Sequence, residues 1–445
     1  MRPLSLPPAS LESTRVQKIA GLLNHADVTA FVAKANASYH HWEDLKRRPP
    51  PIGLNAQEAW TAVKLSRLAR KPLPLADAKG VPFSYWLPEN AYQTLHVVDR
   101  QGGSVLATDD AGRPNVFDEM RHRVLIDSLM EEAIATSQIE GAVTTRRVAK
   151  DLLRTGRKPK DKSEQMIVNG YATVRLIRER IDRPLSVELL HEIQTSMTRD
   201  TLDRPADAGR FRSEEDDVRV IDMRDGDTVF TPPPAATLPG RLGHLFDFAN
   251  ADPASSPFVH PLVRAVILHF WLAYEHPYID GNGRTARALF YWSMLKSGYW
   301  LFEFLTISRI IHSARMQYYR SFLHSETDDN DLTYFLMFQF DVTRRALEDL
   351  RKRLVEVQQQ QQRIQAIRLA ARLNARQRAL LDHALRHPDQ TYTIESHERS
   401  HGIGNDTARA DLRALADRGL LVEVGGKRPR IFAPAPDLAK RLRIK

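Results

Sequence analysis

The sequence predicts a mainly α-helical protein that ends in a smaller, separate unit. Two observations carry this prediction. Hydrophobic residues recur at helical spacing along most of the chain, and turn signals separate short stretches that are rich in β-branched residues. Near residue 372 a polar, glutamine-rich stretch ends, and the sequence beyond it has its own pattern of short elements. We therefore expect four regions: residues 1–115, residues 116–355, a helical linker at 356–372, and the separate unit at 373–445.

Composition places the chain among globular proteins. It has 445 residues, enough for two or three domains, and 42% of them are hydrophobic. We find neither an apolar run of about 20 residues, the length that spans a bilayer, nor the hydrophobic segment of a signal peptide. The absence of cysteine excludes disulfides, thiolate metal sites and thiol catalysis. A cytoplasmic location is the expectation, and the formal net charge of +9 suggests an acidic partner.

Residues 1–115 are expected to form a helical and irregular subdomain. Three prolines at 49–51 interrupt the first helical patterns, and a helical period resumes at 55–70. Aromatic and β-branched residues are frequent at 81–108, where the glycine pair 102–103 is a hairpin turn signal. A short sheet or an ordered loop is expected there.

An amphipathic helix is predicted from about 118 to 140, where Gly141 closes it. Thr136 and Glu140 share one face at i and i+4, and Ser137 is adjacent. Taken alone, these residues indicate no more than a helix end with a glycine cap.

Two more core helices are predicted at 163–182 and 186–199, the second with Ser186 as its N-cap. His191 lies on the second helix. We expect its side chain to be packed or solvated, because no second ligand stands at metal-binding spacing. Farther along, two β-rich stretches flank a turn and predict a hairpin at 218–230.

The central feature is the segment from His276 to Arg287, which reads HPYIDGNGRTAR and lies between two predicted core helices. The preceding helix, 261–275, is apolar nearly all round, and the following one ends at Gly298. The glycines at 281 and 283 allow a ligand to approach the main chain, and N–H groups at a helix N-terminus bind anions. This arrangement indicates a phosphate site in the loop.

Four side chains give this loop its chemistry. Arg284 and Arg287 lie about one turn apart and can each fork onto phosphate oxygens. Asp280 would repel phosphate unless a cation lay between them, which predicts a Mg²⁺ site. His276 can take a proton near neutral pH. Each residue alone is ordinary at a helix end, but the set at this spacing predicts a base beside a phosphate site.

The segment resembles the Fic motif, H-P-F-x-D-G-N-G-R-x-x-R, with Tyr278 in place of phenylalanine. The resemblance implies a helical Fic core at residues 116–355 that transfers a nucleoside monophosphate, most often AMP from ATP, to a hydroxyl side chain of a protein. Gly281 is typical of the AMP-transferring branch, because the phosphotransferring branch has a lysine there.

The resemblance also implies a role for each residue of the segment. His276 would be the catalytic base, and Asp280 would bind Mg²⁺. ATP would be held by Gly281, Asn282, Gly283, Arg284 and Arg287.

Two other parts of the chain match the family. Residues 136–141, TSQIEG, are similar to its inhibitory motif, Ser/Thr-x-x-x-Glu-Gly, and precede the core as in members with an N-terminal inhibitory helix. Glu140 would then pair with Arg287 and repel the triphosphate. The regulatory set would be Thr136, Ser137, Glu140 and Gly141. The hairpin at 218–230 falls where the family has a flap that docks the target by main-chain pairing. On pattern alone, a purely structural hairpin is the alternative.

Residues 373–445 are similar to a winged helix-turn-helix domain, with a helix, a strand, two helices and a β-hairpin turning at glycines 425–426. The recognition helix would run from 406 to 418, and the wing would be lined by Lys427, Arg428 and Arg430. Residues 371–445 hold 15 Lys and Arg against 9 Asp and Glu, so six of the nine net charges lie there. This charge favours DNA. Protein contact or dimerisation is the alternative, supported by Asp411 and Asp417 in the same helix.

Three functions follow from these features. The first is a protein adenylyltransferase restrained by Glu140, using ATP and Mg²⁺ to modify a Tyr, Ser or Thr hydroxyl of a target protein or of itself. In the second, Glu140 activates water and the same site removes AMP. The third is a DNA-binding regulator whose Fic core senses nucleotide. We expect no membrane partner, and the sequence leaves a homodimer open.

Overall fold

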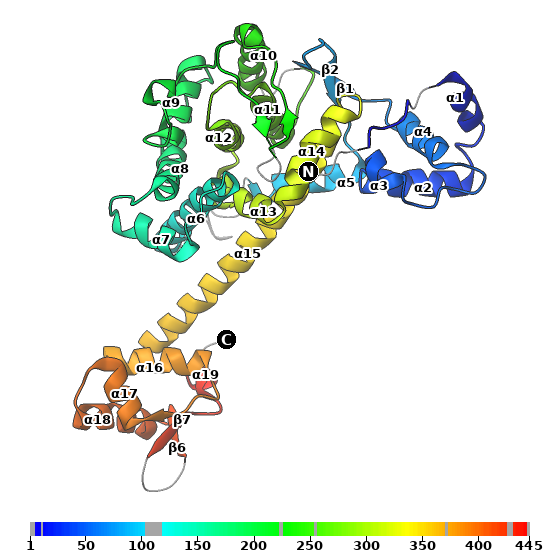
Figure 1. Ribbon diagram of the computed structural model, residues 1–445. Coiled ribbons are helices and arrows are strands. Elements are labelled where there is room, and N and C mark those ends of the chain that lie inside the picture. Colours follow the sequence, from blue (N-terminus) through cyan, green and yellow to red (C-terminus); the bar gives the residue numbers. More distant parts are fainter. Residues whose placement is uncertain are drawn as a thin grey trace. The chain divides into compact units, whose positions relative to one another are not determined.

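The computed structural model describes residues 5–9, 12–102, 118–221, 226–252, 256–369, 373–424 and 430–442. The fold is mainly helical with small sheets, as predicted (Figure 1). It divides into two compact units, Met1–Leu350 and Arg351–Lys445. The division falls within the long helix α15 (Thr333–Leu369), so the linker predicted at 356–372 is helical up to residue 369. Among the helices described here, none is long and apolar enough to cross a membrane.

In the part described here, the first hundred residues contain five helices and a two-stranded antiparallel sheet. The helices are α1 (Ser13–Ala20), α2 (Ala26–Ala37), α3 (Trp42–Leu45), α4 (Ala56–Ser66) and α5 (Glu89–Gly102), and the strands are β1 (Lys71–Ala76) and β2 (Pro82–Tyr85). Helix α4 begins at a capping box in which Asn55 and Glu58 each bind the other's backbone N–H. Helix formation after the prolines at 49–51 is therefore confirmed.

The expectation for residues 81–108 is wrong in part. A strand is present at β2, but residues 89–102 are helical, so Gly102 lies in a helix and not in a hairpin turn. The physical reason is the spacing of Ala91, Leu95 and Val98, which are all buried and recur at the period of a helix. Their helical spacing outweighs the β-branched content of the stretch. Gly103 lies outside the described residues.

Buried charges join the end of α4 and the residues just after it to the segment before α15 and the first turn of that helix. Lys64 Nζ lies 2.7 Å from Asp328 Oδ1, with both side chains almost completely buried. Arg70 binds the buried carboxylate of Asp331 at 3.1 Å, and Arg67 donates to the Tyr334 hydroxyl at 3.0 Å. Breaking such a pair would leave a buried charge without compensation, so these contacts fix α4 against the rest of the unit.

The core of the first unit is built from helices on both sides of α11. They are α6 (Asp118–Ile139), α7 (Arg146–Thr155), α8 (Lys162–Glu179), α9 (Val187–Thr198), α10 (Leu238–Asn250), α11 (Pro261–Glu275), α12 (Asn282–Lys296), α13 (Ile307–Ser313) and α14 (Arg315–Thr327). Short 3₁₀ turns lie between them at η1 (Pro205–Asp207), η2 (Ala235–Thr237) and η3 (Trp300–Phe304). Ser186 caps α9 as predicted, accepting from Leu189 N.

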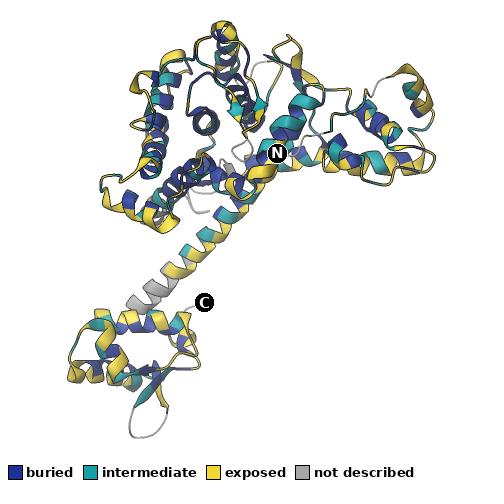
Figure 2. Cartoon of the chain, in the orientation of Figure 1, coloured by how far each residue is buried: buried dark blue, intermediate teal, exposed yellow. Residues whose placement is uncertain are grey.

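Helices α11 and α12 pack against each other and are buried over most of their length (Figure 2). This confirms that the loop between them is held by two core helices. Helix α12 ends at Lys296, and Gly298 follows in the left-handed conformation at φ 85°. The predicted hairpin is present as β3 (Val220–Ile221) paired antiparallel with β4 (Thr228–Phe230). Residues 222–225 of its turn lie outside the described residues.

The second unit has the element order that the sequence predicts. Its elements are α16 (Ala375–Arg386), β5 (Tyr392–Thr393), α17 (Ile394–His401), α18 (Asn405–Asp417), β6 (Leu421–Val424), β7 (Ile431–Pro434) and α19 (Leu438–Arg441). The three strands form an antiparallel sheet in the order β5-β7-β6. Leu381, Leu412, Leu415 and Phe432 are at the centre of its hydrophobic core. The predicted turn at 425–426, with Lys427 and Arg428, lies outside the described residues.

Candidate active site

Helix α11 ends in a left-handed residue, His276, at φ 47° and ψ 54°. Its imidazole Nδ1 lies 3.2 Å from the Ala273 carbonyl oxygen. When Nδ1 donates its proton to that carbonyl, Nε2 is the unprotonated nitrogen and can accept a proton. Burial lowers the pKa of His276, although the hydrogen bond to Ala273 opposes the shift. The side chain is therefore suited to act as a base at neutral pH.

The side chain of Asn282 holds the loop together. Its Oδ1 accepts from Tyr278 N at 2.9 Å, and its Nδ2 donates to Tyr278 O at 2.7 Å. Both polar groups of the amide are thus used inside the loop. The part of Asn282 that remains for a phosphate is its backbone N–H in the first turn of α12, the group that the predicted anion site uses.

Neither of the two glycines at the N-terminus of α12 has room for a Cβ. Gly281 is its N-cap at φ 85°, and a Cβ there would collide with Thr198 Cγ2 at 2.6 Å. Gly283 lies in the first turn, where a Cβ would overlap Oε1 of Glu140. The Glu140 carboxylate therefore lies directly on the predicted anion site, at the positive end of the helix.

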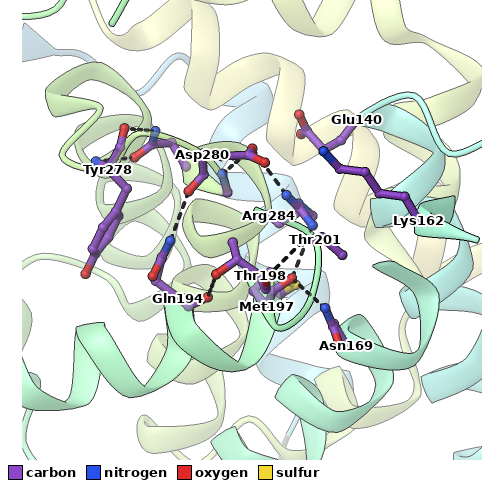
Figure 3. A network of polar contacts seen from close by, with 12 residues as sticks. Glu140, Lys162, Asn169, Gln194, Met197, Thr198, Thr201, Tyr278, Asp280 and Arg284 are labelled. Atoms are coloured by element: carbon purple, nitrogen blue, oxygen red, sulfur yellow. Dashed lines mark hydrogen bonds and ion pairs between the residues drawn. The ribbon is translucent and has the colours of Figure 1, made fainter. Parts of the chain in front are cut away.

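Arg284 is buried and is held by α9 and by Asp280 (Figure 3). Its Nη1 donates to Met197 O at 3.1 Å, and its Nη2 lies 3.3 Å from Asp280 Oδ1. Its Nε has no hydrogen-bond partner among the described residues, although it is buried. A buried donor of this kind is normally satisfied. The guanidinium thus keeps one donor for a ligand.

Arg287 and Glu140 form the ion pair that the sequence predicts. Arg287 Nη2 lies 2.7 Å from Glu140 Oε1 and 3.2 Å from Thr136 O, and its Nε donates to the Thr136 hydroxyl at 2.8 Å. Arg287 is 3% exposed, whereas 31% of the Glu140 side chain is exposed. Thr136 holds the buried Arg287 on the side that faces the protein, and Glu140 contacts it on the side that faces solvent.

Ser137 and Gly141 determine the backbone conformation at the end of α6. The Ser137 carbonyl accepts from Glu140 N and Ala142 N, and Gly141 takes φ 96°, a conformation that favours glycine. The Ser137 hydroxyl donates to Ala133 O within the same helix. Ser137 and Gly141 therefore shape the turn that presents Glu140, while Thr136 contacts Arg287 directly.

The charges of the ion pair reinforce each other. Burial raises the pKa of Glu140, but the charges of Arg287 and Arg284 lower it by more than burial raises it. The carboxyl therefore stays ionised, with a pKa below its usual value. Glu140 in turn raises the pKa of Arg287 against the effect of burial. Glu140 also acts on the base, because its charge raises the pKa of His276 while burial lowers it.

Several residues that hold the loop in place could not be recognised from the sequence. The Gln194 amide donates to Asp280 O at 3.1 Å, and its oxygen accepts from Gly209 N at 2.7 Å. Arg212 binds the carbonyls at the end of α11. The fully buried Glu275 makes a two-point contact with Arg241, at 2.7 and 2.8 Å. No local pattern marks these side chains, since their partners lie far away in the sequence.

Tyr278 is fully buried, and its hydroxyl lies 3.0 Å from His191 Nδ1. Phe211 packs against His191 with ring centroids 4.4 Å apart. His191 is packed, as expected. The hydroxyl that distinguishes tyrosine from phenylalanine at this position has a partner in the partly buried His191, so the substitution is accommodated without an unsatisfied polar group.

The hairpin lies against the helix that carries the base. Phe230 of β4 packs on Tyr274 of α11, with ring centroids 5.1 Å apart. Ile221 of β3 is half exposed. Because the two strands pair with each other alone among the described strands, each has an outer edge that can accept another strand.

Asp280 fits the magnesium role. The carboxylate is about half exposed, at 48%, and Oδ1 accepts from Gly281 N and contacts Arg284. The described residues contain no cluster of three or more acidic or histidine ligands. Mg²⁺ commonly takes one or two protein carboxylates together with phosphate oxygens and water. A single carboxylate beside an anion site matches that pattern.

The structure thus places a histidine, a helix N-terminus, two buried arginines and one exposed carboxylate within a single turn and its flanks. These groups can bind a polyphosphate and deprotonate a hydroxyl beside it. The Glu140 carboxylate occupies part of the same site.

Comparisons with known proteins agree with this chemistry. Residues 184–294 match the model of the Fic/DOC family. The chain is 31% identical over 117 residues to protein adenylyltransferase Fic of Drosophila willistoni, covering 26% of this chain and 22% of that protein. It is 36% identical over 95 residues to protein adenylyltransferase fic-1 of Caenorhabditis elegans, covering 21% and 16%. The chain therefore spans about a fifth of the length of these relatives.

Solved structures were also found to be similar. A Fic family protein from Desulfovibrio desulfuricans aligns with a TM-score of 0.49 at 19% identity, covering 78% of this chain and 95% of that one. Residues 134–508 of Fic-1 from C. elegans align with a TM-score of 0.49 at 17% identity, covering 80% and 90%.

Proposed function

Because residues 184–294 form a Fic/DOC family domain, we propose that the protein is a protein adenylyltransferase. It would transfer AMP from ATP to the hydroxyl of a tyrosine, serine or threonine, in a target protein or in itself. One observation carries the proposal. The N-terminus of α12, with two glycines and two buried arginines, directly follows the loop that begins at His276. The curated relatives, which are named adenylyltransferases, support it.

The reaction would use these groups in a fixed order. The N–H groups of α12 and Arg284 would hold the α- and β-phosphates, and Arg287 the γ-phosphate. His276 would take the proton of the target hydroxyl, whose oxygen then attacks the α-phosphorus. The bond from the α-phosphorus to the oxygen that bridges to the β-phosphate breaks, and pyrophosphate leaves. Mg²⁺, held by Asp280, would neutralise phosphate charge when bound.

We also propose that Glu140 restrains this activity. Its carboxylate neutralises Arg287 at 2.7 Å and lies where the first turn of α12 would receive phosphate. A triphosphate would have to displace it, and its negative charge would repel the incoming phosphates. Arg287 would bind the γ-phosphate after Glu140 withdraws. The target would dock on the outer edge of the hairpin at 218–230, beside Tyr274 and His276.

The proposal is tested by incubating full-length variants with Mg²⁺ and ATP labelled on either the α- or the γ-phosphate, alone and in a cell lysate. Glu140→Gly should raise labelling from the α-position by at least about tenfold, equivalent to ~1.4 kcal/mol. Adding His276→Ala should lower it by about 10²–10⁴-fold, the range of general base catalysis. Glu179→Gly removes an exposed glutamate at the end of α8 and should have no effect.

Two outcomes would contradict the proposal. Labelling from the γ-position would indicate phosphotransfer. If the Glu140→Gly protein labelled no more than wild type, including itself, the restraint by Glu140 would be wrong. Removal of AMP by the same site is distinguished by giving purified AMP-modified product to wild type. Loss of label that requires Glu140 would identify it as the group that activates water.

We propose DNA binding as a second function, for residues 373–445. The supporting observation concerns Asp411, whose charge argued against DNA in the sequence. Its side chain is 5% exposed and points into the unit, where Arg376 Nε lies 2.8 Å and His397 Nε2 3.3 Å from Oδ2. Arg409 and Arg413 of the same helix are exposed. Asp411 is thus removed from the outer face of α18, where Asp406 and Asp417 stay exposed beside these arginines. Salt-dependent binding of duplex DNA by the full chain tests the proposal.

A further inference from the structure

One arginine contacts both the end of α11 and the base of the hairpin. Arg212 is 8% exposed and binds four main-chain carbonyls. Its own N–H donates to Pro277 O at 2.8 Å, its Nε to His276 O at 2.9 Å, and its Nη2 to Glu275 O at 3.2 Å and to Pro233 O at 2.5 Å. The guanidinium and backbone of one residue thus bind three consecutive carbonyls around the proposed base.

These carbonyls need a partner from outside the helix. The last carbonyls of an α-helix have no intrahelical donor, and a cation at a helix C-terminus is favourable. In α11 the chain also enters the left-handed conformation at His276, which is uncommon for a residue with a side chain. Arg212 supplies donors on both sides of that residue. It therefore fixes the backbone from which the imidazole projects.

The bond to Pro233 reaches the far end of the hairpin segment. Arg212 and Pro233 are 21 residues apart, and β3 and β4 both lie between them. The guanidinium therefore closes this segment into a loop at its base. Phe230 packs on Tyr274, which gives β4 a separate contact with α11. The hairpin and His276 consequently share one anchor.

We propose that Arg212 is a positioning residue that sets the place of the docking hairpin relative to His276. This rests on the proposed function, since it assigns the docked hydroxyl to the hairpin and the base to His276. The anion site has other supports, because Asn282 holds Tyr278 and Gln194 holds Asp280. Removing the Arg212 hydrogen bonds would therefore slow transfer much more than it weakens nucleotide binding. An error of about 1 Å in such a geometry can reduce the rate by about 10²-fold.

The test uses Arg212→Met, which keeps most of the aliphatic stem and removes the guanidinium donors. The matched control is Arg210→Met, two residues away, whose guanidinium contacts the side chains of Asp207 and Asp216 and the carbonyl of its neighbour Phe211. Both are made in the full-length Glu140→Gly protein. Three quantities are measured: ATP affinity by calorimetry, the rate of transfer from α-labelled ATP, and amide hydrogen exchange by mass spectrometry.

Arg212→Met should lower the transfer rate by about 10²-fold and leave ATP affinity within about twofold. Exchange should rise together in peptides covering β3 and β4 and in those covering residues 275–278. Arg210→Met should change neither the rate nor exchange at 275–278. Arg212→Lys keeps the charge, but one ammonium cannot reproduce the planar fork, so it should restore little of the rate.

The idea is wrong if Arg212→Met loses affinity and rate equally, or if Arg212→Lys restores the full rate. It is also wrong if exchange rises in the hairpin alone. Hydrogen exchange keeps the two proposals separable. If the Glu140→Gly parent transfers no AMP, the proposed function fails, while a joint rise in exchange at the hairpin and at 275–278 still supports the shared anchor. If Arg212→Met does not fold, Arg212→Lys provides the exchange comparison.

Discussion

At the scale of single residues, the proposed base is held in a state that suits neutral pH. Burial lowers the pKa of His276, and the charge of Glu140 raises it in part. The unprotonated form, which can take a proton, is present above the pKa. A lowered pKa therefore moves the loss of activity to more acidic solutions than the ordinary value of about 6.5.

Glu140→Gly should lower the pKa of His276 further, because it removes the negative charge that favours the imidazolium. The measurement is an NMR titration of the imidazole C2–H, assigned by comparison with His276→Ala. The acid limb of the transfer rate in the Glu140→Gly protein should lie at the same pH, below about 6.5. Glu179→Gly should leave the titration of His276 unchanged. A pKa of His276 that is equal or higher in the Glu140→Gly protein would contradict the expected effect of the Glu140 charge.

How much of the site could be predicted follows from where the partners of each residue lie. His276, Asp280, Arg284 and Arg287 are close in sequence, so their shared turn was recognisable from spacing. The ion pair of Glu140 with Arg287 joins residues 147 apart and was predicted through the family resemblance, not from periodicity. Arg212 resembles Arg210 in sequence, and only the fold distinguishes them: Arg212 is buried against carbonyls, whereas 39% of the Arg210 side chain is exposed and its partners are carboxylates.

At the scale of elements, the two glycines at the start of α12 have different tasks, which predicts different effects of alanine. In Gly281→Ala the backbone stays at φ 85°, which costs about 1–2 kcal/mol for a residue with a Cβ, and the methyl collides with Thr198. In Gly283→Ala the methyl meets the end of the Glu140 side chain, which can rotate away. We expect urea denaturation to show a loss of stability for the first variant and little change for the second.

Nucleotide binding should rank the two variants the other way round, with the larger loss of affinity in Gly283→Ala. The methyl of Gly283→Ala lies over the first turn of α12, so it should weaken binding of a non-hydrolysable ATP analogue even in the Glu140→Gly background. Calorimetry provides the comparison at one temperature and Mg²⁺ concentration. If Gly283→Ala bound the analogue as well as its parent, the first turn of α12 would not be the phosphate site.

Helices could be predicted where hydrophobic residues follow a single helical period, as in α11, α12 and α18. Helix α5 was missed because its β-branched residues and terminal glycines suggested a hairpin, whereas burial follows Ala91, Leu95 and Val98. The pairing of β1 with β2 was missed as well. The proline-rich sequence of β1, KPLPLA, gives little indication of a strand. Both cases depend on what the rest of the fold covers, which a local pattern does not contain.

At the scale of the whole molecule, charge is distributed unevenly along the chain. Residues 371–445 hold 15 Lys and Arg against 9 Asp and Glu, although they are about a sixth of the sequence. Their net charge would have little meaning for DNA if the acidic groups lay on the same face as the arginines. Asp411 does not, because it is buried against Arg376 and His397, whereas Asp406 and Asp417 of the same helix are exposed. Sequence could predict the charge of α18 but not which of its charges faces solvent.

Binding of duplex DNA by the full-length protein should therefore fall steeply with salt, measured by fluorescence anisotropy between about 50 and 200 mM. Arg409→Ala combined with Arg413→Ala should weaken binding and reduce the salt slope by about one for each phosphate that the variant no longer neutralises. The matched control removes the same charge from the first unit, by Arg344→Ala with Arg345→Ala, and should leave the slope unchanged. Equal decreases in affinity for both pairs would indicate attraction by net charge alone. A helix that binds DNA phosphates releases counterions from the DNA, which makes its affinity depend on salt. Affinity without salt dependence, or no affinity, would instead assign α18 to a protein interface.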